Sequence, residues 1–229
     1  MNNQKGNVLQ IKEVCKNFEN GKQTMEVLKN INLDIKSGEF ISIMGQSGCG
    51  KSTLLYIMGG LDSPTKGEIV LDGKKIAEMS DKEKGAMRRR KLGFIFQFYN
   101  LVHNLSVKDN VLLPVIMDGQ KISNYNDKLN EVLEFVGLSD RKEFTPRELS
   151  GGQQQRVAVA RALIMEPEII MADEPIGNLD SNSGTQVMKL FKEINEKKGT
   201  TIIQVTHSEE AAEYGDRIIR MKDGVIINM

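Results

Sequence analysis

Short apolar segments alternate with longer segments of mixed polarity along most of the chain. Five of these segments are apolar at most positions, as strands buried on both faces of a parallel sheet are. They are residues 40–44, 92–96, 168–172, 201–206 and 217–221. Helix-like segments lie between them, and this alternation predicts an α/β protein with a largely parallel sheet.

A second strand pattern appears near the N-terminus. Ile31, Leu33 and Ile35 alternate with polar residues, which is typical of a strand with one buried face. Asp72-Gly73 lies between two short strand-like segments and predicts a hairpin turn, and Asp223-Gly224 repeats that signal near the C-terminus. We therefore expect a small antiparallel layer beside the parallel core.

The middle of the chain, residues 98–160, has no convincing strand pattern. Ser106 with Asp109 three residues later is a helix start signal. The apolar periodicity of residues 129–136 ends at Gly137, which is a helix stop signal. This part of the chain predicts a helical insertion between two parts of one α/β core.

The composition fits a packed globular protein. Of the 229 residues, 39% are hydrophobic and 21 are glycine, which excludes disorder, collagen-like repeats and a disulfide scaffold for the whole chain. The 31 Lys and Arg balance 31 Asp and Glu, which argues against neutralisation of a nucleic-acid backbone as the main task. The basic run at residues 88–91 is interpreted as a solvated helix face, and no nucleic-acid partner is expected.

The sequence lacks the usual signals for secretion or membrane insertion. No stretch approaches 18 consecutive apolar residues, and the first ten residues lack the apolar segment of a signal peptide. The two cysteines make no disulfide framework and fit a reducing compartment. We expect a soluble, intracellular protein.

Residues 45–52, GQSGCGKS, fit the pattern G-x-x-x-x-G-K-[ST] and directly follow a predicted strand. A helical stretch at residues 51–59 comes next. The glycines let successive backbone N–H groups turn toward an anion, and the helix N-terminus adds partial positive charge. In such a loop Lys51 reaches the β- and γ-phosphates of a nucleotide, and Ser52 holds Mg²⁺.

Residues 168–174, EIIMADE, form an apolar strand that ends in two carboxylates. The carboxyl end of a buried strand beside a phosphate-binding loop is where Mg²⁺ needs a second protein contact. Asp173 is therefore assigned to Mg²⁺, and Glu174 to orienting or deprotonating a water molecule. The alternative, a solvated pair of acids at a strand end, is disfavoured by the phosphate-binding loop.

Residues 149–153, LSGGQ, precede a predicted helix over residues 153–165. Ser150 is a suitable N-cap, and Gly151 and Gly152 leave backbone N–H groups uncovered at the start of the helix. The segment thereby predicts a second anion site that works like the first. From these residues alone, an ordinary helix cap is the alternative.

Together these motifs resemble the ATP-binding subunits of ABC transporters, over essentially the whole chain. Gln97 stands where that family has its Q-loop glutamine, and residues 177–180, GNLD, match its D-loop. His207 matches the switch histidine, and Phe18 stands where an aromatic ring stacks on adenine. The spacing agrees as well: 46 residues separate the P-loop lysine from Gln97, and the next intervals, to the LSGGQ serine, the strand-end aspartate and His207, are 53, 23 and 34 residues.

The resemblance implies a single ABC ATPase domain over residues 1–229, with a P-loop NTPase (RecA-like) core. Residues 1–97 and 161–229 are implied to form the catalytic α/β core with the antiparallel β layer. Residues 98–160 are implied to form the inserted helical subdomain that carries the LSGGQ signature motif.

The resemblance also implies roles for individual residues. Glu174 is implied as the general base, Lys51 and His207 as the groups that share the developing charge, and Gln97 as the sensor of γ-phosphate. The residues implied to contact ATP are Phe18, Gly45, Gln46, Ser47, Gly48, Cys49, Gly50, Lys51, Ser52, Thr53, Gln97, Ser150, Gly151, Gly152, Gln153 and Asp180. Those implied to hold Mg²⁺ are Ser52, Gln97 and Asp173.

The sequence around the Q-loop, RRRKLGF and FQFYNL, resembles that of the macrolide-exporter and lipoprotein-releasing (MacB- and LolD-like) branch, which includes antimicrobial-peptide export ATPases.

The resemblance implies two partners. One is a second copy of the chain, packed head to tail so that each LSGGQ meets the ATP of the other. The other is an integral membrane permease with a large external domain. Since the chain ends at Met229, that permease is expected to be a separate polypeptide, with the ATPase peripheral on the cytoplasmic face of the cell membrane.

Two rival classes remain open. A non-transport ABC regulator of a permease-linked cell-wall process shares these motifs, although its segment after the Q-loop glutamine usually differs from FYNLV. A soluble ABC protein of DNA repair or translation needs a long coiled-coil insertion or two tandem nucleotide domains, for which 229 residues leave no room. The cargo is not encoded here, because an ATP motor does not touch it.

Overall fold

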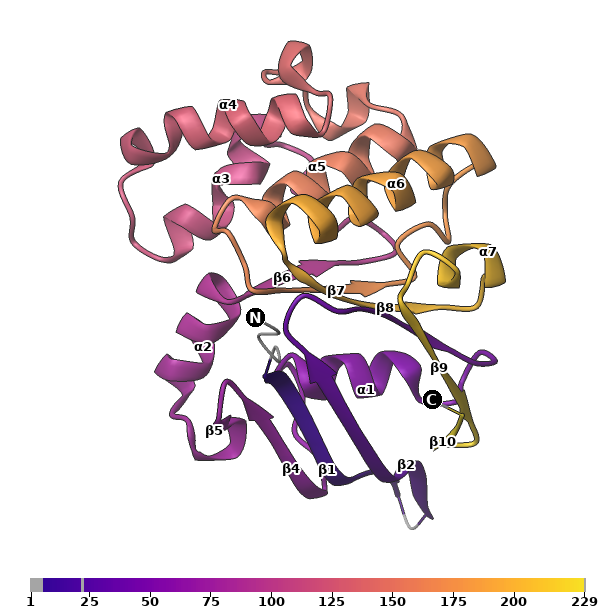
Figure 1. Cartoon of the computed structure of the whole chain (residues 1–229). Helices are drawn as coiled ribbons and strands as arrows, with labels where there is room; N and C mark the ends of the chain where they lie inside the picture. The colour runs from indigo at the N-terminus through magenta and orange to yellow at the C-terminus, as the bar shows by residue number, and fades with distance from the viewer. Residues whose placement is uncertain (1–5, 22, 229) are drawn as a thin grey trace, which may run out of the picture.

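A six-stranded sheet forms the centre of the protein in a computed structural model that describes residues 6–21 and 23–228 (Figure 1). Its strand order is β10-β9-β3-β8-β7-β6, and every neighbouring pair except β10 with β9 is parallel. The parallel core predicted from the sequence is confirmed. Its strands are β3 (Phe40–Met44), β6 (Leu92–Ile95), β7 (Ile169–Asp173), β8 (Thr201–Thr206), β9 (Arg217–Lys222) and β10 (Val225–Asn228).

Helix α1 (Lys51–Met58) packs between the parallel sheet and a four-stranded antiparallel sheet (Figure 1). The strand order of the antiparallel sheet is β2-β1-β4-β5. This sheet confirms the predicted antiparallel layer, and Ile31, Leu33 and Ile35 are all buried. Both Asp-Gly pairs form the hairpin turns predicted from the sequence, between β4 and β5 and between β9 and β10. The strands are β1 (Asn7–Asn20), β2 (Gln23–Lys36), β4 (Lys66–Leu71) and β5 (Lys74–Lys75).

The parallel sheet supplies apolar side chains to a separate core on each of its faces. Successive side chains of a strand point to opposite faces. On β7, Ile169 and Met171 therefore join the core around α1 and the antiparallel sheet. Ile170 and Ala172 join the core formed with the helices on the opposite face. This double burial explains why the strand is apolar at every position before its terminal carboxylate.

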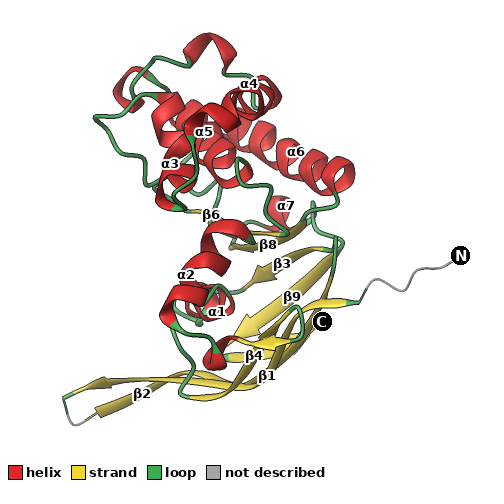
Figure 2. Ribbon diagram, turned by 90° about the vertical axis from the view of Figure 1, so that its left-hand side faces the viewer, coloured by secondary structure: helices red, strands yellow, loops and turns green. Residues whose placement is uncertain are grey.

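Most helices gather above the parallel sheet (Figures 1 and 2). The structure describes every residue between the end of β6 and the start of β7, and none of them forms a strand. None of the helices within the described residues has the length and apolarity that a bilayer span requires. The helices are α2 (Asp81–Arg90), α3 (Val107–Met117), α4 (Asn126–Phe135), α5 (Gly151–Leu163), α6 (Ser181–Lys198) and α7 (Glu209–Ala212), with short 3₁₀ turns η1 (Ile76–Glu78), η2 (Ile122–Tyr125), η3 (Ser139–Arg141) and η4 (Pro146–Glu148).

The helix signals read from the sequence are present, with one shift. Ser106 caps α3 by accepting a hydrogen bond from the N–H of Asp109. Helix α5 begins two residues before the predicted helix, so that Gly151 and Gly152 lie inside its first turn. The reason is a capping box, in which Ser150 and Gln153 each accept a hydrogen bond from the backbone N–H of the other.

Residues 88–91, interpreted from the sequence as a solvated helix face, are partly exposed, with side-chain exposures of 31% for Arg89, 58% for Arg90 and 40% for Lys91. They lie at the end of α2, and each forms a hydrogen bond or ion pair within the chain. Arg88 donates to the carbonyl of Gly60, and Lys91 pairs with Asp72 and Glu168. The other two arginines both pair with Asp118, whose side chain is fully buried just after α3. These partners lie far away in the sequence, so the charge run alone did not show them.

A bulge in β1 requires a glycine in the neighbouring strand β4. The register of β1 against β4 shifts between Lys12 and Cys15, and the bulged residue Glu13 has a φ of 51°. Gly67 lies opposite with a φ of +84°, and a Cβ built on it would stand 2.4 Å from the carbonyl oxygen of Glu13. Both the backbone conformation and the space therefore exclude a side chain.

We expect Gly67→Ala to destabilise the protein more than Gly73→Ala. Both glycines have a positive φ, which costs an L-residue about 1–2 kcal/mol. A Cβ at position 67 would also collide with backbone atoms, whereas a Cβ at position 73 would have no neighbour within 4 Å. Urea denaturation of the two variants measures the difference, and equal losses would show that the bulge does not confine position 67.

Candidate active site

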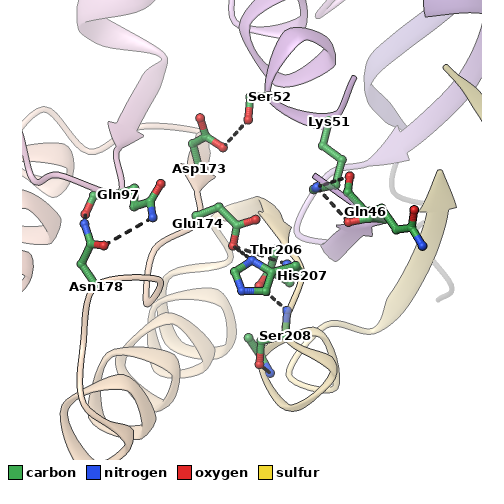
Figure 3. A network of polar contacts seen from close by, with 12 residues as sticks. Gln46, Lys51, Ser52, Gln97, Asp173, Glu174, Asn178, Thr206, His207 and Ser208 are labelled. Carbon is green, nitrogen blue, oxygen red and sulfur yellow. Dashed lines mark hydrogen bonds and ion pairs between the residues drawn. The ribbon is translucent and has the colours of Figure 1, made fainter. Parts of the chain in front are cut away.

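The carboxyl ends of four parallel strands meet at one edge of the central sheet, where ligands bind in open α/β sheets (Figure 3). Strand β3 leads into the glycine-rich loop, β6 into Gln97, β7 ends at Asp173, and His207 follows β8. A cavity of about 670 Å³ opens beside this edge. It is lined by Phe18, Met25, Val27, Ser47, Gly48, Gly50, Lys51, Ser52, Thr53, Gln97, Asp173, Glu174 and His207.

The glycine-rich loop takes a conformation that only glycine adopts readily. Gly48 and Gly50 have φ values of 81° and 101°, and a Cβ on Gly50 would lie 2.9 Å from the carbonyl oxygen of Val27. Helix α1 starts directly after Gly50 without a side-chain cap, so its first N–H groups are free to meet an anion. The loop therefore has the backbone geometry of a phosphate cradle.

Lys51 is held against this loop. Its side chain is buried, with 6% exposure, and Nζ donates to the carbonyl oxygens of Gly45 at 2.9 Å and Gln46 at 3.1 Å (Figure 3). Gly45, Gln46 and Cys49, all predicted to contact ATP, do not line the main cavity. They line a second hollow of about 550 Å³, next to β9 and β10.

Ser52 and Asp173 form the oxygen pair expected for a metal site. Ser52 Oγ donates to Asp173 Oδ1 at 2.8 Å (Figure 3), which joins the start of α1 to the end of β7. Among residues 6–21 and 23–228, no group of three or more His, Cys, Asp or Glu could hold a metal by itself. Mg²⁺ suits this arrangement, because it prefers oxygen ligands and is usually bound by one or two carboxylates together with substrate phosphates.

Tyr56 also contacts Asp173, although none of the sequence motifs includes it. Its hydroxyl donates to Asp173 Oδ2 at 2.6 Å. Burial, followed by the hydrogen bond to Asp173 and the negative charge of Asp173, raises the pKa of Tyr56 to about 12. The phenol therefore stays a hydrogen-bond donor at neutral pH. A local signal was available, since Tyr56 follows Ser52 by four residues on one helix face.

Glu174 has an unusual backbone conformation and a defined carboxylate. Its φ is 47°, and such left-handed residues, which cluster at functional sites, cost of order 1–3 kcal/mol. Its N–H donates to the carbonyl of Val205 at 2.9 Å, which ties it to β8. Its Oε2 lies 3.0 Å from Nδ1 of His207, whose side chain is largely exposed (Figure 3). The pair is placed so that Glu174 can accept a proton beside an imidazole.

Gln97 joins the cavity wall to the segment after Glu174. Its backbone carbonyl accepts a hydrogen bond from the side chain of Asn178 at 3.0 Å, and its own amide donates to Asn178 at 3.4 Å (Figure 3). Asp180, at the end of this segment, accepts a hydrogen bond from the N–H of Ser183 and caps α6. The structure thus shows Asp180 as a helix cap and places Gln97 in the cavity.

The LSGGQ segment lies elsewhere. Within the described parts of the chain, the residues that line the cavity include none of 150–153. Its two glycines allow close packing: a Cβ on Gly151 would meet the hydroxyl of Tyr99 at 3.0 Å, and one on Gly152 would meet Oγ of Ser183 at 2.8 Å. The predicted second anion site therefore does not share the cavity of the glycine-rich loop.

Phe18 stands at the rim of the cavity with 42% of its surface exposed. Lys16 Nζ lies 4.8 Å from the ring centroid and is itself held by Asp62 at 2.7 Å. Met25 pairs with Phe18 across the β1–β2 hairpin and lines the cavity with Val27. The sequence analysis missed both, although a hairpin partner of Phe18 is the natural place for a second apolar contact.

The family model for ABC transporters matches residues 28–177 of the chain. This range contains the glycine-rich loop, Gln97, LSGGQ and both strand-end carboxylates. The chain belongs to the ABC transporter family. The resemblance stated from the motifs is confirmed, and so is the P-loop NTPase fold.

Two relatives and one solved structure define the branch of this ABC ATPase. The lipoprotein-releasing system ATP-binding protein LolD of Aquifex aeolicus is 48% identical over 202 residues, which are 88% of this chain and 90% of LolD. The macrolide export ATP-binding/permease protein MacB of Aggregatibacter actinomycetemcomitans is 46% identical over 222 residues, which are 97% of this chain and 34% of MacB. The chain thus spans about a third of MacB.

The solved structure is that of the ATP-binding cassette MJ0796 of Methanocaldococcus jannaschii, a dimer in a post-hydrolysis state bound to ADP and Pi. It matches with a TM-score of 0.88 and 45% identity, over 96% of this chain and 97% of the other. The chain is therefore an ABC ATPase of the MacB/LolD type, as predicted.

We expect Phe18→Ala to weaken ATP binding about 5- to 150-fold, because base stacking on an aromatic ring is worth about 1–3 kcal/mol. Phe18→Tyr keeps the ring and is expected to bind normally. Titration with a fluorescent ATP analogue measures the affinities. Ile122→Ala is a matched control, since Ile122 is equally exposed at 43% but lies in η2. Unchanged affinity in Phe18→Ala would mean that the ring packs in the antiparallel sheet and does not contact adenine.

Proposed function

We propose that two copies of this ABC ATPase close head to tail on two ATP molecules, and that closure and hydrolysis drive a membrane permease. The observation that carries the proposal is the separation of the two anion sites. The cavity holds the loop of Lys51 and the carboxylates, whereas the N-terminus of α5 lies outside it. A second copy supplies the missing N–H groups. The dimeric state of MJ0796 with ADP and Pi supports this arrangement.

In the proposed reaction the γ-phosphate lies over the glycine-rich loop, with the Lys51 ammonium beside it. Glu174 accepts the proton of the attacking water, and His207 stabilises charge next to it, 3.0 Å from the carboxylate. Ser52 and Asp173 hold Mg²⁺, which when bound neutralises charge on the phosphate oxygens. Gln97 connects this site to the loop that follows it.

The loop after Gln97 is proposed to receive the permease. Phe98 is 73% exposed and Val102 is 45% exposed, which is unusual for large apolar side chains so close together in the chain. The loop is held firmly, because the buried side chain of Asn110 accepts a hydrogen bond from the N–H of Val102 and donates one to its carbonyl. Arg161 donates to two further loop carbonyls, those of residues 99 and 100. A rigid loop that presents apolar side chains suits docking of a partner.

The names of the relatives suggest the class of cargo. LolD is named for lipoprotein release and MacB for macrolide export. We infer that the permease exports or extracts a peptide, an antibiotic or a lipoprotein, and that the ATPase is peripheral on the cytoplasmic face of the membrane. That this permease has a large external domain stays a prediction. Copurification from membranes identifies it and separates transport from regulation of a cell-wall process.

The test of the ATPase site is Glu174→Gln. The amide keeps nearly the same size but cannot accept the proton, so turnover is expected to fall about 10²- to 10⁴-fold. ATP binding survives, because Lys51, Ser52 and Asp173 hold the nucleotide without Glu174. Size-exclusion chromatography with light scattering should show a monomer without nucleotide and a stable dimer with ATP.

Ser150→Arg added to Glu174→Gln is the matched control. It places a bulky cation at the N-terminus of α5 and is expected to abolish the dimer while each subunit still binds ATP. Hydrolysis at the wild-type rate in Glu174→Gln, or an oligomeric state independent of ATP, would contradict the proposal.

Docking of the permease is tested with Phe98→Asp. A carboxylate in place of an exposed ring is expected to prevent copurification with the membrane partner, because its burial at an apolar interface is costly. Phe98→Leu, which keeps an apolar side chain, should copurify as the wild type does. Thermal melting checks that both variants are folded. Membrane association that persists in Phe98→Asp would exclude this loop as the docking point.

A further inference from the structure

Tyr56 lies behind the proposed metal site rather than in it. It is half-buried on α1, one helical turn after Ser52, and it does not belong to the lining of the cavity. Its hydroxyl nevertheless lies 2.6 Å from Asp173 Oδ2. The hydroxyl of Tyr56 therefore reaches the proposed metal site through Asp173.

Ser52 and Tyr56, both on α1, donate hydrogen bonds to different oxygens of the Asp173 carboxylate. Ser52 donates to Oδ1 at 2.8 Å and Tyr56 donates to Oδ2 at 2.6 Å. The terminal torsion of an aspartate is soft and roughly two-fold, so one hydrogen bond fixes its plane poorly. Two hydrogen bonds from one rigid helix fix both the plane of the Asp173 carboxylate and the oxygen that faces Ser52.

The contact leaves the metal-facing atoms available. A serine hydroxyl has one donor and two lone pairs, so Ser52 can keep donating to Asp173 while a lone pair of Oγ faces a cation. Tyr56 uses Oδ2, the oxygen that Ser52 does not use. Asp173 is itself buried, with 8% exposure, so bulk water is poorly placed to replace the phenol if it is removed.

We propose that Tyr56 is a positioning residue for the Mg²⁺ site, and that it holds Asp173 so that Oδ1 stays beside Ser52 Oγ. The inference rests on the proposed function, in which Ser52 and Asp173 hold the Mg²⁺ of bound ATP. Outer partners that orient metal ligands typically change metal affinity or activity 10- to 100-fold when they are lost. Loss of the phenol hydroxyl therefore weakens the contribution of Mg²⁺ to nucleotide binding, and leaves the affinity for nucleotide without metal unchanged.

A purely structural role is the competing explanation. The ring of Tyr56 packs against the core around α1, and its carbonyl accepts the N–H of Leu61 at 2.9 Å. Tyr56→Phe separates the two roles, because it removes only the hydroxyl and keeps the ring and the backbone. The metal-dependent and metal-free affinities then report on different parts of the side chain.

The experiment titrates a fluorescent ADP analogue into wild type and Tyr56→Phe, once with saturating Mg²⁺ and once with EDTA. In Tyr56→Phe we expect the affinity gain from Mg²⁺ to shrink at least about 10-fold, while the affinity in EDTA stays unchanged. Mn²⁺ gives a second readout, since the electron paramagnetic resonance spectrum of its complex with ADP and protein should broaden in the variant. Tyr125→Phe is the matched control, because Tyr125 lies in η2 and should behave as the wild type does.

The outcomes distinguish the inference from the function on which it rests. An unchanged affinity gain from Mg²⁺ in Tyr56→Phe overturns the positioning role. An equal loss in Mg²⁺ and in EDTA also overturns it, because that result shows a structural role of the hydroxyl. If the wild type itself gains no affinity from Mg²⁺, the proposed site of Ser52 and Asp173 fails, and the role of Tyr56 fails with it.

Discussion

The parallel pairing of β3, β8 and β7 is the constraint on which the whole site depends. Met44 pairs with Thr206, and Asp173 pairs with Val205, so the three strands end within about one residue of each other. Because parallel strands present their carboxyl ends at one edge, three segments far apart in the sequence deliver their polar residues to one place. The apolar side chains on both faces of the sheet fix this register, since a slip of one residue would exchange the two cores.

Helix α5 adds a second constraint, because it is bonded to two loops at the site. The buried amide of Gln155 donates to the carbonyl of Pro175, the residue after Glu174. Two turns further on, the guanidinium of Arg161 donates to the carbonyls of Tyr99 and Asn100. Leaving the buried amide of Gln155 unpaired would cost about 1–3 kcal/mol. The N-terminus of α5, the loop after Gln97 and the peptide after Glu174 are therefore bound into one unit.

The sequence was informative where the physics is local. Residues 40–44 and 201–206 became strands with the predicted limits, since an unbroken apolar run next to turn residues suffices. The cap at Ser150 and the glycine-rich loop likewise depend on neighbours in the chain. The partners of the basic run were missed because these contacts join segments from different parts of the fold, whereas Met25 lies opposite Phe18 in the same hairpin and was within reach of the local pattern. Tyr56 lies between these cases: its spacing from Ser52 was visible, but its acceptor belongs to a distant strand.

The positions of the two anion sites follow from the same architecture. The glycine-rich loop and α1 face the edge of the sheet, whereas the start of α5 packs against α6, with Gly152 close to Ser183. The two helix N-termini cannot approach each other while the two cores keep the helices on opposite faces of the sheet. One chain can thus offer each half of a nucleotide site but cannot close it upon itself. In the proposed dimer, a second copy turned head to tail would supply the missing half of each site, and ATP would be part of the interface.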